Sequence, residues 1–322
     1  MSAEITILGA GVAGLTVAHE LSARGAAVRI LDPAGDPGPH GCSWWAGGML
    51  APDCEGETAE EPVIRLGREA APWWRAAGAE VTEAGTLVVA LGRDRGELDR
   101  FARRTSGHVW LDRAALEALE PDLAERFPRA LHFRSEAHLA PRAALATLRA
   151  NLAEWGVTVA PEGPETGTVI DARGLSARDR LADLRGVRGE MAVLRAPSVA
   201  LSRPVRLLHP RHPLYVVPRG GGIHMLGATQ IESDGRGPAT LRSTVELLNA
   251  AFALHPAFAE AEVLEIGADA RPAFPDNLPR IVRRDGRIHV NGLYRHGFLL
   301  APALARRVAD LVLEGRISEV VQ

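Results

Sequence analysis

The chain has 322 residues and a formal net charge of −3, with 46% hydrophobic and 24% charged residues. This balance predicts an ordinary globular protein and excludes disordered, collagen-like and fibrous classes. A chain of this length can bury roughly three quarters of its unfolded surface, which is enough for about two domains. Because the charges are spread without a basic block, we expect no nucleic-acid partner.

All 37 basic residues are arginine, since no lysine occurs in the sequence. Pyridoxal enzymes and Schiff-base aldolases need a lysine amine, and P-loop nucleotidases need a phosphate-binding lysine. The composition therefore excludes these chemistries.

The two cysteines, Cys42 and Cys54, are too few for a zinc framework, so we expect no metal site. The chain opens on a strand-like segment rather than a signal-peptide pattern, which favours a reducing cytoplasmic location. No apolar run approaches the 18 or so residues of a membrane span, and we expect no membrane partner.

The first part of the chain predicts a strand, a glycine turn, a helix and a second strand. The apolar run 5–8 passes directly into Gly9-Ala10-Gly11-Val12-Ala13-Gly14. Helical spacing follows to about residue 24, and the second strand, 27–31, ends at Asp32. This order is that of a nucleotide-binding βαβ unit.

Each part of this unit has a role in binding a dinucleotide. The glycines allow a sharp turn, close approach of a pyrophosphate and tight packing of helix on strand, while the helix amino end attracts the phosphates. Asp32 lies 23 positions after Gly9 and can accept hydrogen bonds from a ribose 2′-hydroxyl. The alternative is a glycine-rich turn in another α/β protein.

The remaining pattern predicts an α/β fold with a discontinuous Rossmann-like domain and an inserted α+β domain built on an antiparallel or mixed sheet. We expect helices within 57–78, 112–120, 141–155 and 238–254, with a long terminal helix ending near residue 313. We expect strands at 85–91, 156–159, 168–174, 190–194, 214–217, 223–226 and 288–292. The predicted nucleotide domain comprises 1–78, 137–188 and 268–322, and the substrate domain comprises 79–136 and 189–267.

Four ordered blocks carry a resemblance to a known family. They are residues 43–52, 214–219 with 226–229, 270–276, and 294–302. Together with the glycine turn, these blocks resemble the D-amino-acid-oxidase-like flavoproteins, and among them the glycine oxidases of thiamin biosynthesis. The resemblance implies noncovalent FAD, oxidation of glycine to its imine, and reduction of O2 to H2O2. It also implies that the imine supplies the thiamin thiazole and suggests a homo-oligomer.

The resemblance also assigns residues. Arg271 matches the arginine that pairs with the substrate carboxylate, and Tyr215 matches a tyrosine that hydrogen-bonds it. This chemistry is sound, because a guanidinium binds a carboxylate through two parallel hydrogen bonds. With Arg295 and Met49, these two form the expected catalytic set. The expected cofactor contacts are Gly9, Gly11, Val12, Ala13, Gly14, Asp32, Ser43, Gly47, Gly48, Met49, Gly174, Arg271, Arg295, His296, Gly297, Phe298 and Leu299.

We expect hydride transfer from the substrate α-carbon to flavin N5 without an obligatory side-chain base, so that positioning and electrostatics dominate catalysis. The terminal helix would direct its positive amino end at the reduced flavin. His209, His212, His224 and His296 match no metal-ligand spacing and are not expected to be catalytic.

Alternatives stay open at this stage. Gln230 stands where an apolar pocket residue could occur, and Pro213 and Leu214 precede Tyr215, so the substrate could instead be sarcosine or a D-amino acid. The enzyme could also be a dehydrogenase that passes electrons to an acceptor other than O2. Two further classes are a nonenzymatic flavin-binding protein and a nicotinamide dehydrogenase.

Overall fold

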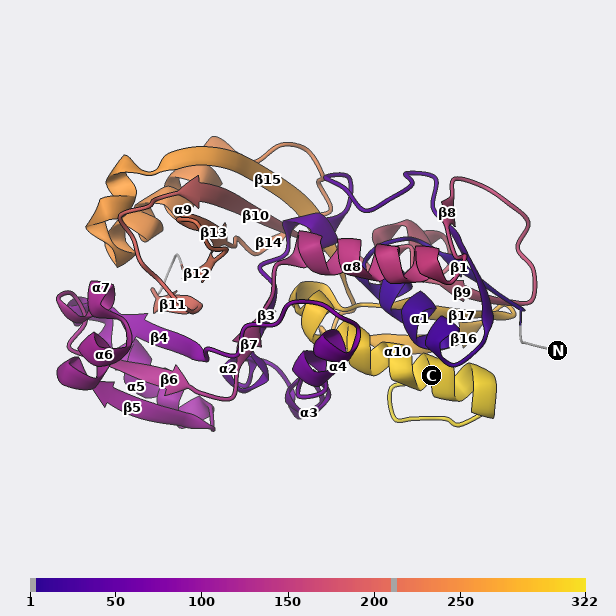
Figure 1. Ribbon diagram of the computed structural model, residues 1–322, viewed down its shortest axis with the longest axis horizontal. Coiled ribbons are helices and arrows are strands. Elements are labelled where there is room, and N and C mark those ends of the chain that lie inside the picture. Colours follow the sequence, from indigo (N-terminus) through magenta and orange to yellow (C-terminus); the bar gives the residue numbers. More distant parts are fainter. Residues whose placement is uncertain (1–3, 210–212) are drawn as a thin grey trace.

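The structure is a computed structural model that describes residues 4–209 and 213–322. Two large sheets lie toward opposite ends of the long axis, and the strands β10 and β15 extend from one toward the other (Figure 1). His212, one of the histidines weighed from the sequence, lies outside the described residues.

The first sheet has six strands in the order β16-β17-β9-β1-β2-β8. All neighbours are parallel except β16 and β17, which form an antiparallel edge. The strands are β1 (Glu4–Leu8), β2 (Ala27–Leu31), β8 (Val159–Ala160), β9 (Thr168–Asp171), β16 (Arg280–Arg284) and β17 (Arg287–Asn291). The central strand β1 is an almost continuous apolar run, as expected for a parallel strand covered on both faces.

Helices α1 (Val12–Ala23), α8 (Pro141–Glu154) and α10 (Gly297–Glu314) pack beside this sheet, and α1 contacts both of the others. Their shared core includes Leu15, Leu21 and Leu304, which are fully buried. α10 ends where Gly315 adopts a left-handed conformation (φ 69°), and its amide donates to the Leu311 carbonyl.

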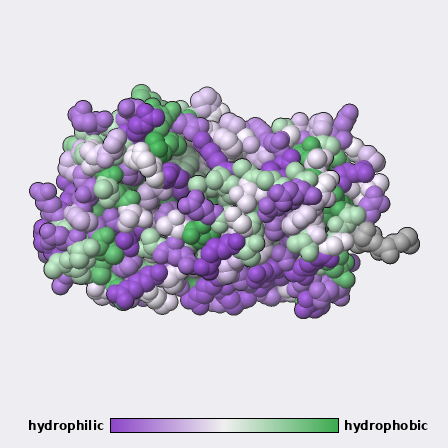
Figure 2. Space-filling model, in the orientation of Figure 1, coloured by the Kyte–Doolittle hydropathy of each residue, from purple (hydrophilic) through white to green (hydrophobic). Residues whose placement is uncertain are grey.

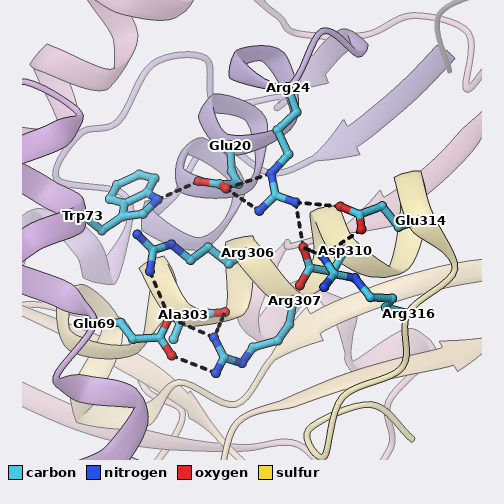
Figure 3. A network of polar contacts seen from close by, with 10 residues as sticks. All are labelled: Glu20, Arg24, Glu69, Trp73, Ala303, Arg306, Arg307, Asp310, Glu314 and Arg316. Atoms are coloured by element: carbon cyan, nitrogen blue, oxygen red, sulfur yellow. Dashed lines mark hydrogen bonds and ion pairs between the residues drawn. The ribbon is translucent and has the colours of Figure 1, made fainter.

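An ion-pair network fastens α1 and α10 to α4 (Ala70–Ala76) on the outside of this core (Figure 3). Arg24, which caps the carboxyl end of α1, contacts Glu20 and Asp310, each at 2.6 Å. Trp73 of α4 donates its indole N–H to Glu20 at 2.7 Å. Three helices that are distant in sequence are therefore joined by polar contacts above an apolar interface.

The second sheet has nine strands, with the path β14-β10-β13-β12-β11-β4-β6-β5 and β15 paired with β10. It is antiparallel except where β11 lies parallel to β4. The strands are β4 (Thr86–Ala90), β5 (His108–Asp112), β6 (Arg129–Phe133), β10 (Arg185–Arg195), β11 (Val205–Leu208), β12 (Leu214–Pro218), β13 (Ile223–Gly227), β14 (Ile231–Glu232) and β15 (Glu262–Ala273). This mixed sheet confirms the expected α/β architecture.

Shorter elements cover and connect the sheets. The helices are α2 (Pro52–Glu55), α3 (Glu61–Gly67), α5 (Arg95–Arg104), α6 (Arg113–Leu119), α7 (Pro121–Ala124) and α9 (Leu241–Leu254). The 3₁₀ turns are η1 (Cys42–Trp45), η2 (Gly92–Asp94), η3 (Gly174–Asp179), η4 (Pro256–Glu260) and η5 (Tyr294–His296). A two-stranded pair, β3 (Met49–Leu50) and β7 (Ala137–His138), connects the segments between the sheets.

Two predicted elements differ from the structure, and one strand was missed. The helical stretch 57–78 is divided into α3 and α4, because the last turn of α3 tightens and the Glu69 amide bonds the Leu66 carbonyl three residues back. The strand expected at 156–159 is reduced to the short β8. The twelve-residue β15 was not predicted, although it pairs along the whole length of β10.

The strands of the six-stranded sheet all come from the three ranges predicted for the nucleotide domain. However, β10 and β15 each pass through a predicted boundary, at 188/189 and 267/268 respectively. The domain limits therefore stay a prediction.

The face seen in Figure 2 is largely hydrophilic, with an apolar group at the end where β15 and α9 lie. Exposed apolar side chains there include Val263 and Leu264 on β15 and Leu241 and Phe252 on α9. Among residues 4–209 and 213–322, no helix has the length and apolar content to cross a membrane.

Candidate functional site

A cavity of about 710 Å³ lies between the two sheets and is lined by segments from both. The turn after β1, the end of β2, the segment 42–49 and the first turn of α10 line it from the side of the six-stranded sheet. Strands β11, β12 and β15 line it from the other side. We call the side of the six-stranded sheet the cofactor end and the side of the nine-stranded sheet the substrate end.

The glycine turn is held against the sheet by two close backbone approaches. Gly9 has φ 102°, and a Cβ there would lie 2.7 Å from the Ala172 carbonyl oxygen. A Cβ on Gly14 would lie 1.9 Å from the Gly9 carbonyl oxygen. Both positions therefore require glycine, since a side chain would force strand and helix apart. Gly14 does not line the cavity, and its part in the turn is packing.

The amino end of α1 faces the cavity. Gly11 caps the helix without a side-chain bond, and the first amide, Val12 N–H, donates to Ser43 Oγ at 3.0 Å. Because the positive end of a helix dipole favours anions, this end is suited to a pyrophosphate.

Asp32 lies at the end of β2, on the cavity wall. Its Oδ2 accepts the Ala10 N–H at 2.8 Å and its Oδ1 accepts the Ala34 N–H at 2.9 Å. Two backbone donors thus fix the carboxylate, and each oxygen keeps a lone pair for a ribose hydroxyl.

The first turn of α10 lines the cavity beside the start of α1, since an added Cβ on Gly297 would lie 3.3 Å from Val12 Cγ1. Gly297, Phe298 and Leu299 line the cavity at the start of this 18-residue helix. A long helix that begins at the wall presents the positive end of its dipole to whatever occupies the space.

Arg271 lies on β15 at the substrate end and reaches across Gly189 of β10, whose added Cβ would lie 1.9 Å from a guanidinium nitrogen. It donates to the Thr229 carbonyl oxygen at 3.3 Å. Among residues 4–209 and 213–322, no carboxylate forms an ion pair with Arg271. The guanidinium therefore lines the cavity with most of its donors available.

Tyr215 of β12 packs against Gly47 and Gly227, where an added Cβ would contact its ring. Burial raises the pKa of its hydroxyl, although Arg271, Arg206 and Arg219 oppose the shift. The phenol is therefore a neutral donor at physiological pH, next to the Arg271 guanidinium.

A second charged group at the substrate end was not predicted from the sequence. Glu55 of α2 is 8% exposed and pairs with Arg206 of β11 through Oε1, and with Arg295 at 2.8 Å through Oε2. Burial alone would raise the pKa of this carboxyl, but Arg295 and Arg206 outweigh burial and lower it strongly. The group therefore stays ionised.

His296 lies 3.5 Å from Glu55 through Nδ1 and is 5% exposed. Burial lowers its pKa to about 4, with Glu55 opposing and Arg295 adding to the shift. The imidazole is therefore neutral at physiological pH and a weak base, and its exclusion from catalysis stays a prediction.

Arg219 supports the wall from behind. It donates to the Gly47 carbonyl at 2.6 Å and to the Leu139 carbonyl at 2.9 Å. Burial lowers its pKa to about 10, so it remains charged. This arginine fixes the backbone next to Met49, whose strand β3 pairs with β7.

The structure brings together every candidate residue except Gly14. The cavity is lined by Gly9, Gly11, Val12, Ala13, Asp32, Ser43, Gly47, Gly48, Met49, Gly174, Tyr215, Arg271, Arg295, His296, Gly297, Phe298 and Leu299. Glu55, Arg206 and Arg219 were missed. Arg219 closes the block 214–219, but Glu55 and Arg206 carry no motif of their own.

No cluster of His, Cys, Asp and Glu in the described part of the chain could hold a metal ion. Cys42 lines the cavity, but burial, with Asp269 adding to it, raises the pKa of its thiol to about 11. The thiol is therefore protonated and unsuited to act as a nucleophile.

The glycine cradle, the α1 amino end and the carboxylate at the end of β2 are the features of a dinucleotide-binding α/β protein. The chain belongs to the FAD dependent oxidoreductase (DAO) family, whose model matches residues 4–311. The expected fold class and the FAD cofactor are thereby confirmed. The residues of the cavity fit this cofactor. The glycine turn leaves room for a pyrophosphate, the start of α1 favours that anion, and Asp32 can accept a hydrogen bond from a ribose hydroxyl.

Relatives extend this assignment along the whole chain. A putative thiamine biosynthesis oxidoreductase ThiO from Rhizobium etli is 59% identical over 315 residues, covering 96% of each chain. A glycine oxidase from Geobacillus kaustophilus is 27% identical, covering 96% of this chain and 92% of its own. The chain spans about half of a bifunctional protein ThiO/ThiG from Trichormus variabilis, at 27% identity.

Solved structures share the fold. The glycine oxidase from Bacillus cereus superposes with a TM-score of 0.83 at 23% identity, covering 98% of each chain. An iminodiacetate oxidase from Chelativorans superposes with a TM-score of 0.81 at 24% identity, covering 98% of this chain and 96% of its own. These solved structures therefore share the two-sheet architecture of the chain.

Proposed function

We propose that the protein oxidises glycine at its α-carbon to the imine, with FAD as the electron acceptor and O2 as the oxidant that yields H2O2. The observation that carries this proposal is Arg271, a guanidinium on the cavity wall that forms no ion pair with a described carboxylate. The similarity to a thiamine biosynthesis oxidoreductase and to glycine oxidases supports the small amino acid as substrate.

The substrate carboxylate would bind the Arg271 guanidinium and accept a hydrogen bond from the Tyr215 hydroxyl. A planar guanidinium holds a carboxylate in one orientation, so the rest of a small amino acid is oriented with it. Because the two side chains come from β15 and β12 of one sheet, their separation is fixed by the fold.

FAD, when bound, accepts the electron pair from the α-carbon. The residues that would hold it are Gly9, Gly11, Val12, Ala13, Asp32, Ser43, Gly47, Gly48, Met49 and Gly174, with Gly14 supporting the turn and Arg295 to Leu299 forming the cavity wall at the start of α10. Glu55 is held by Arg206 and Arg295, and the lowered pKa of His296 makes its imidazole a weak base. Catalysis would therefore rest on positioning and on the helix dipole of α10.

The reaction would supply an imine for the thiazole of thiamin. Two longer relatives, each named as a bifunctional protein ThiO/ThiG, support this role. We place the reaction in the reducing cytoplasm, in keeping with two free cysteines. A homo-oligomer stays a prediction.

Substitution of Arg271 tests the proposal. Loss of a charged hydrogen-bond pair costs about 3 kcal/mol, so Arg271→Ala should raise the glycine KM by roughly 100-fold while FAD stays bound. Arg271→Lys should recover only part of the loss, because an ammonium lacks the planar pair of donors. The measurement is steady-state H2O2 formation together with flavin absorbance.

Arg283→Ala provides the control, because this arginine is exposed on β16 and does not line the cavity. Its kinetics should equal those of the wild type. Unchanged glycine kinetics in Arg271→Ala would remove Arg271 from the substrate site.

A further inference from the structure

A smaller cavity of about 290 Å³ lies next to the main one. Thr58, Gln230, Tyr294, Arg295 and His296 line both cavities. These shared residues form the wall between the two spaces. The far side of the smaller cavity is polar, with Glu60, Asp276 and Asn277 among its lining residues.

One hydrogen bond joins the two sides of this wall. The Tyr294 hydroxyl donates to Gln230 Oε1 at 2.9 Å, across 64 positions of sequence. Tyr294 belongs to η5, beside α10, whereas Gln230 lies in the segment between β13 and β14. The bond therefore connects the two halves of the molecule at the substrate end.

Tyr294 is held firmly on its own side. Its backbone has φ 52°, in the left-handed region, where a bulky side chain is uncommon and persists only when its surroundings fix it. Its ring stands edge-on to His296 at 5.9 Å, and the Arg295 guanidinium lies 5.8 Å from the ring centroid. Arg295 is fixed in turn by Glu55 at 2.8 Å and by Thr58 Oγ1 at 2.7 Å.

Gln230 is placed next to the carboxylate site. The preceding residue, Thr229, accepts the hydrogen bond from Arg271 through its carbonyl. Gln230 is itself solvent-exposed, and its hydrogen bond to Tyr294 holds its amide at the wall between the two cavities. A substrate held by Arg271 would thus lie within reach of this wall.

We propose that the Gln230–Tyr294 pair is a size filter that closes the substrate end of the cavity. While the bond is intact, the wall limits the site to amino acids of glycine size. When the wall is opened, the smaller cavity joins the main one and admits carboxylates with a larger substituent. This inference rests on the proposed function for the position of the substrate, and its test also works without turnover.

The first experiment measures binding of unreactive carboxylates to the FAD-loaded protein by perturbation of the visible flavin spectrum. Acetate represents a glycine-sized ligand, and isobutyrate and benzoate represent larger ones. Because a steric filter discriminates by roughly 10-fold or more per methylene group, Gln230→Ala should lower the benzoate-to-acetate Kd ratio by at least about 10-fold.

Tyr294→Phe separates the hydrogen bond from the bulk of the ring. It removes only the hydroxyl donor, so Gln230 is released while the aromatic wall remains, and the ratio should fall by about 3-fold. Glu60→Ala is the control, because Glu60 lines only the smaller cavity and should leave the ratio unchanged. An unchanged ratio in both Gln230→Ala and Tyr294→Phe would overturn the size filter.

The second experiment compares kcat/KM for glycine, sarcosine, N-ethylglycine and D-valine. In Gln230→Ala, the values for N-ethylglycine or D-valine relative to glycine should rise by at least about 10-fold. If glycine fails to reduce the flavin but the Kd ratio shifts, the proposed function fails and the size filter stands. If glycine is oxidised and neither ratio shifts, the size filter fails and the proposed function stands.

Discussion

The two ends of the cavity are built in different ways. At the cofactor end, the glycine turn after β1 offers mostly backbone and lies close in sequence to Asp32, while segment 42–49 and the start of α10 complete the wall. The substrate end is made of charged side chains that come from separate elements, such as Glu55 on α2, Arg206 on β11 and Arg271 on β15. The cofactor end therefore depends on the steric room around its backbone, whereas the substrate end depends on the balance between its positive and negative side chains.

The largest effect is expected at the substrate end. Glu55→Gln leaves the Arg206 and Arg295 guanidiniums without their carboxylate, and removing one partner of a buried ion pair costs roughly 3–5 kcal/mol. Denaturant unfolding of the FAD-loaded protein measures this loss.

Glu262→Gln is a matched control, because Glu262 pairs with Arg195 at 3.0 Å, both side chains are exposed, and an exposed pair contributes at most about 1 kcal/mol. Equal losses in the two variants would contradict the contrast between a charge-balanced interior and an ordinary surface.

The buried carboxyl of Glu136 gives a pH-dependent prediction. Burial raises its pKa from 4.5 to about 7, with Arg206 opposing. Between these pH values the Glu136 carboxyl is ionised in the unfolded chain and protonated in the folded chain. The free energy of unfolding therefore falls as pH rises from about 4.5 to 7 and then levels off. The loss is on the order of 3 kcal/mol.

Glu136→Gln removes this titration and keeps an oxygen to accept the Cys54 N–H. The difference in unfolding free energy between the variant and the wild type should therefore favour the variant more at pH 8 than at pH 5. Unfolding free energies at these two pH values provide the measurement, and an equal difference between the proteins at both would contradict the buried, protonated state.

At the cofactor end the expected effects are steric. Gly14→Ala places a Cβ against the Gly9 carbonyl, and such overpacking costs roughly 1–3 kcal/mol. Gly11→Ala is the matched variant, because its Cβ would meet only Ser43 Oγ, at 3.4 Å.

We expect Gly14→Ala to lower the melting temperature of the apoprotein, whereas Gly11→Ala should weaken FAD binding with little change in that temperature. Thermal unfolding and FAD titration distinguish the two. Similar melting temperatures for the two variants would contradict the packing role of Gly14.

The smallest effect is expected in the network on the outer face of the helices (Figure 3). Arg24 and Asp310 are each more than a quarter exposed, so a double-mutant cycle on this pair should give about 0.5 kcal/mol, less at high salt. A coupling of several kcal/mol would place this network among the buried ion pairs.

The difference between the two ends also explains what the sequence could predict. The glycine turn and Asp32 form one local pattern, so their spacing indicates both structure and role. Arg271 was identified through a resemblance to a family, and the strand that carries it, β15, was not predicted because its exposed first half lacks alternation. Glu55 and Arg206 meet only after folding, 151 positions apart in sequence.

Anaerobic mixing of the FAD-loaded protein with glycine, recorded in the visible flavin spectrum and followed by air, tests the central claim most directly. The account predicts that glycine bleaches the flavin and that air restores the spectrum with formation of H2O2. It predicts also that Arg271→Ala requires far more glycine for the same bleaching. A bound flavin that glycine leaves oxidised would contradict the proposal that this cavity joins FAD to a glycine carboxylate.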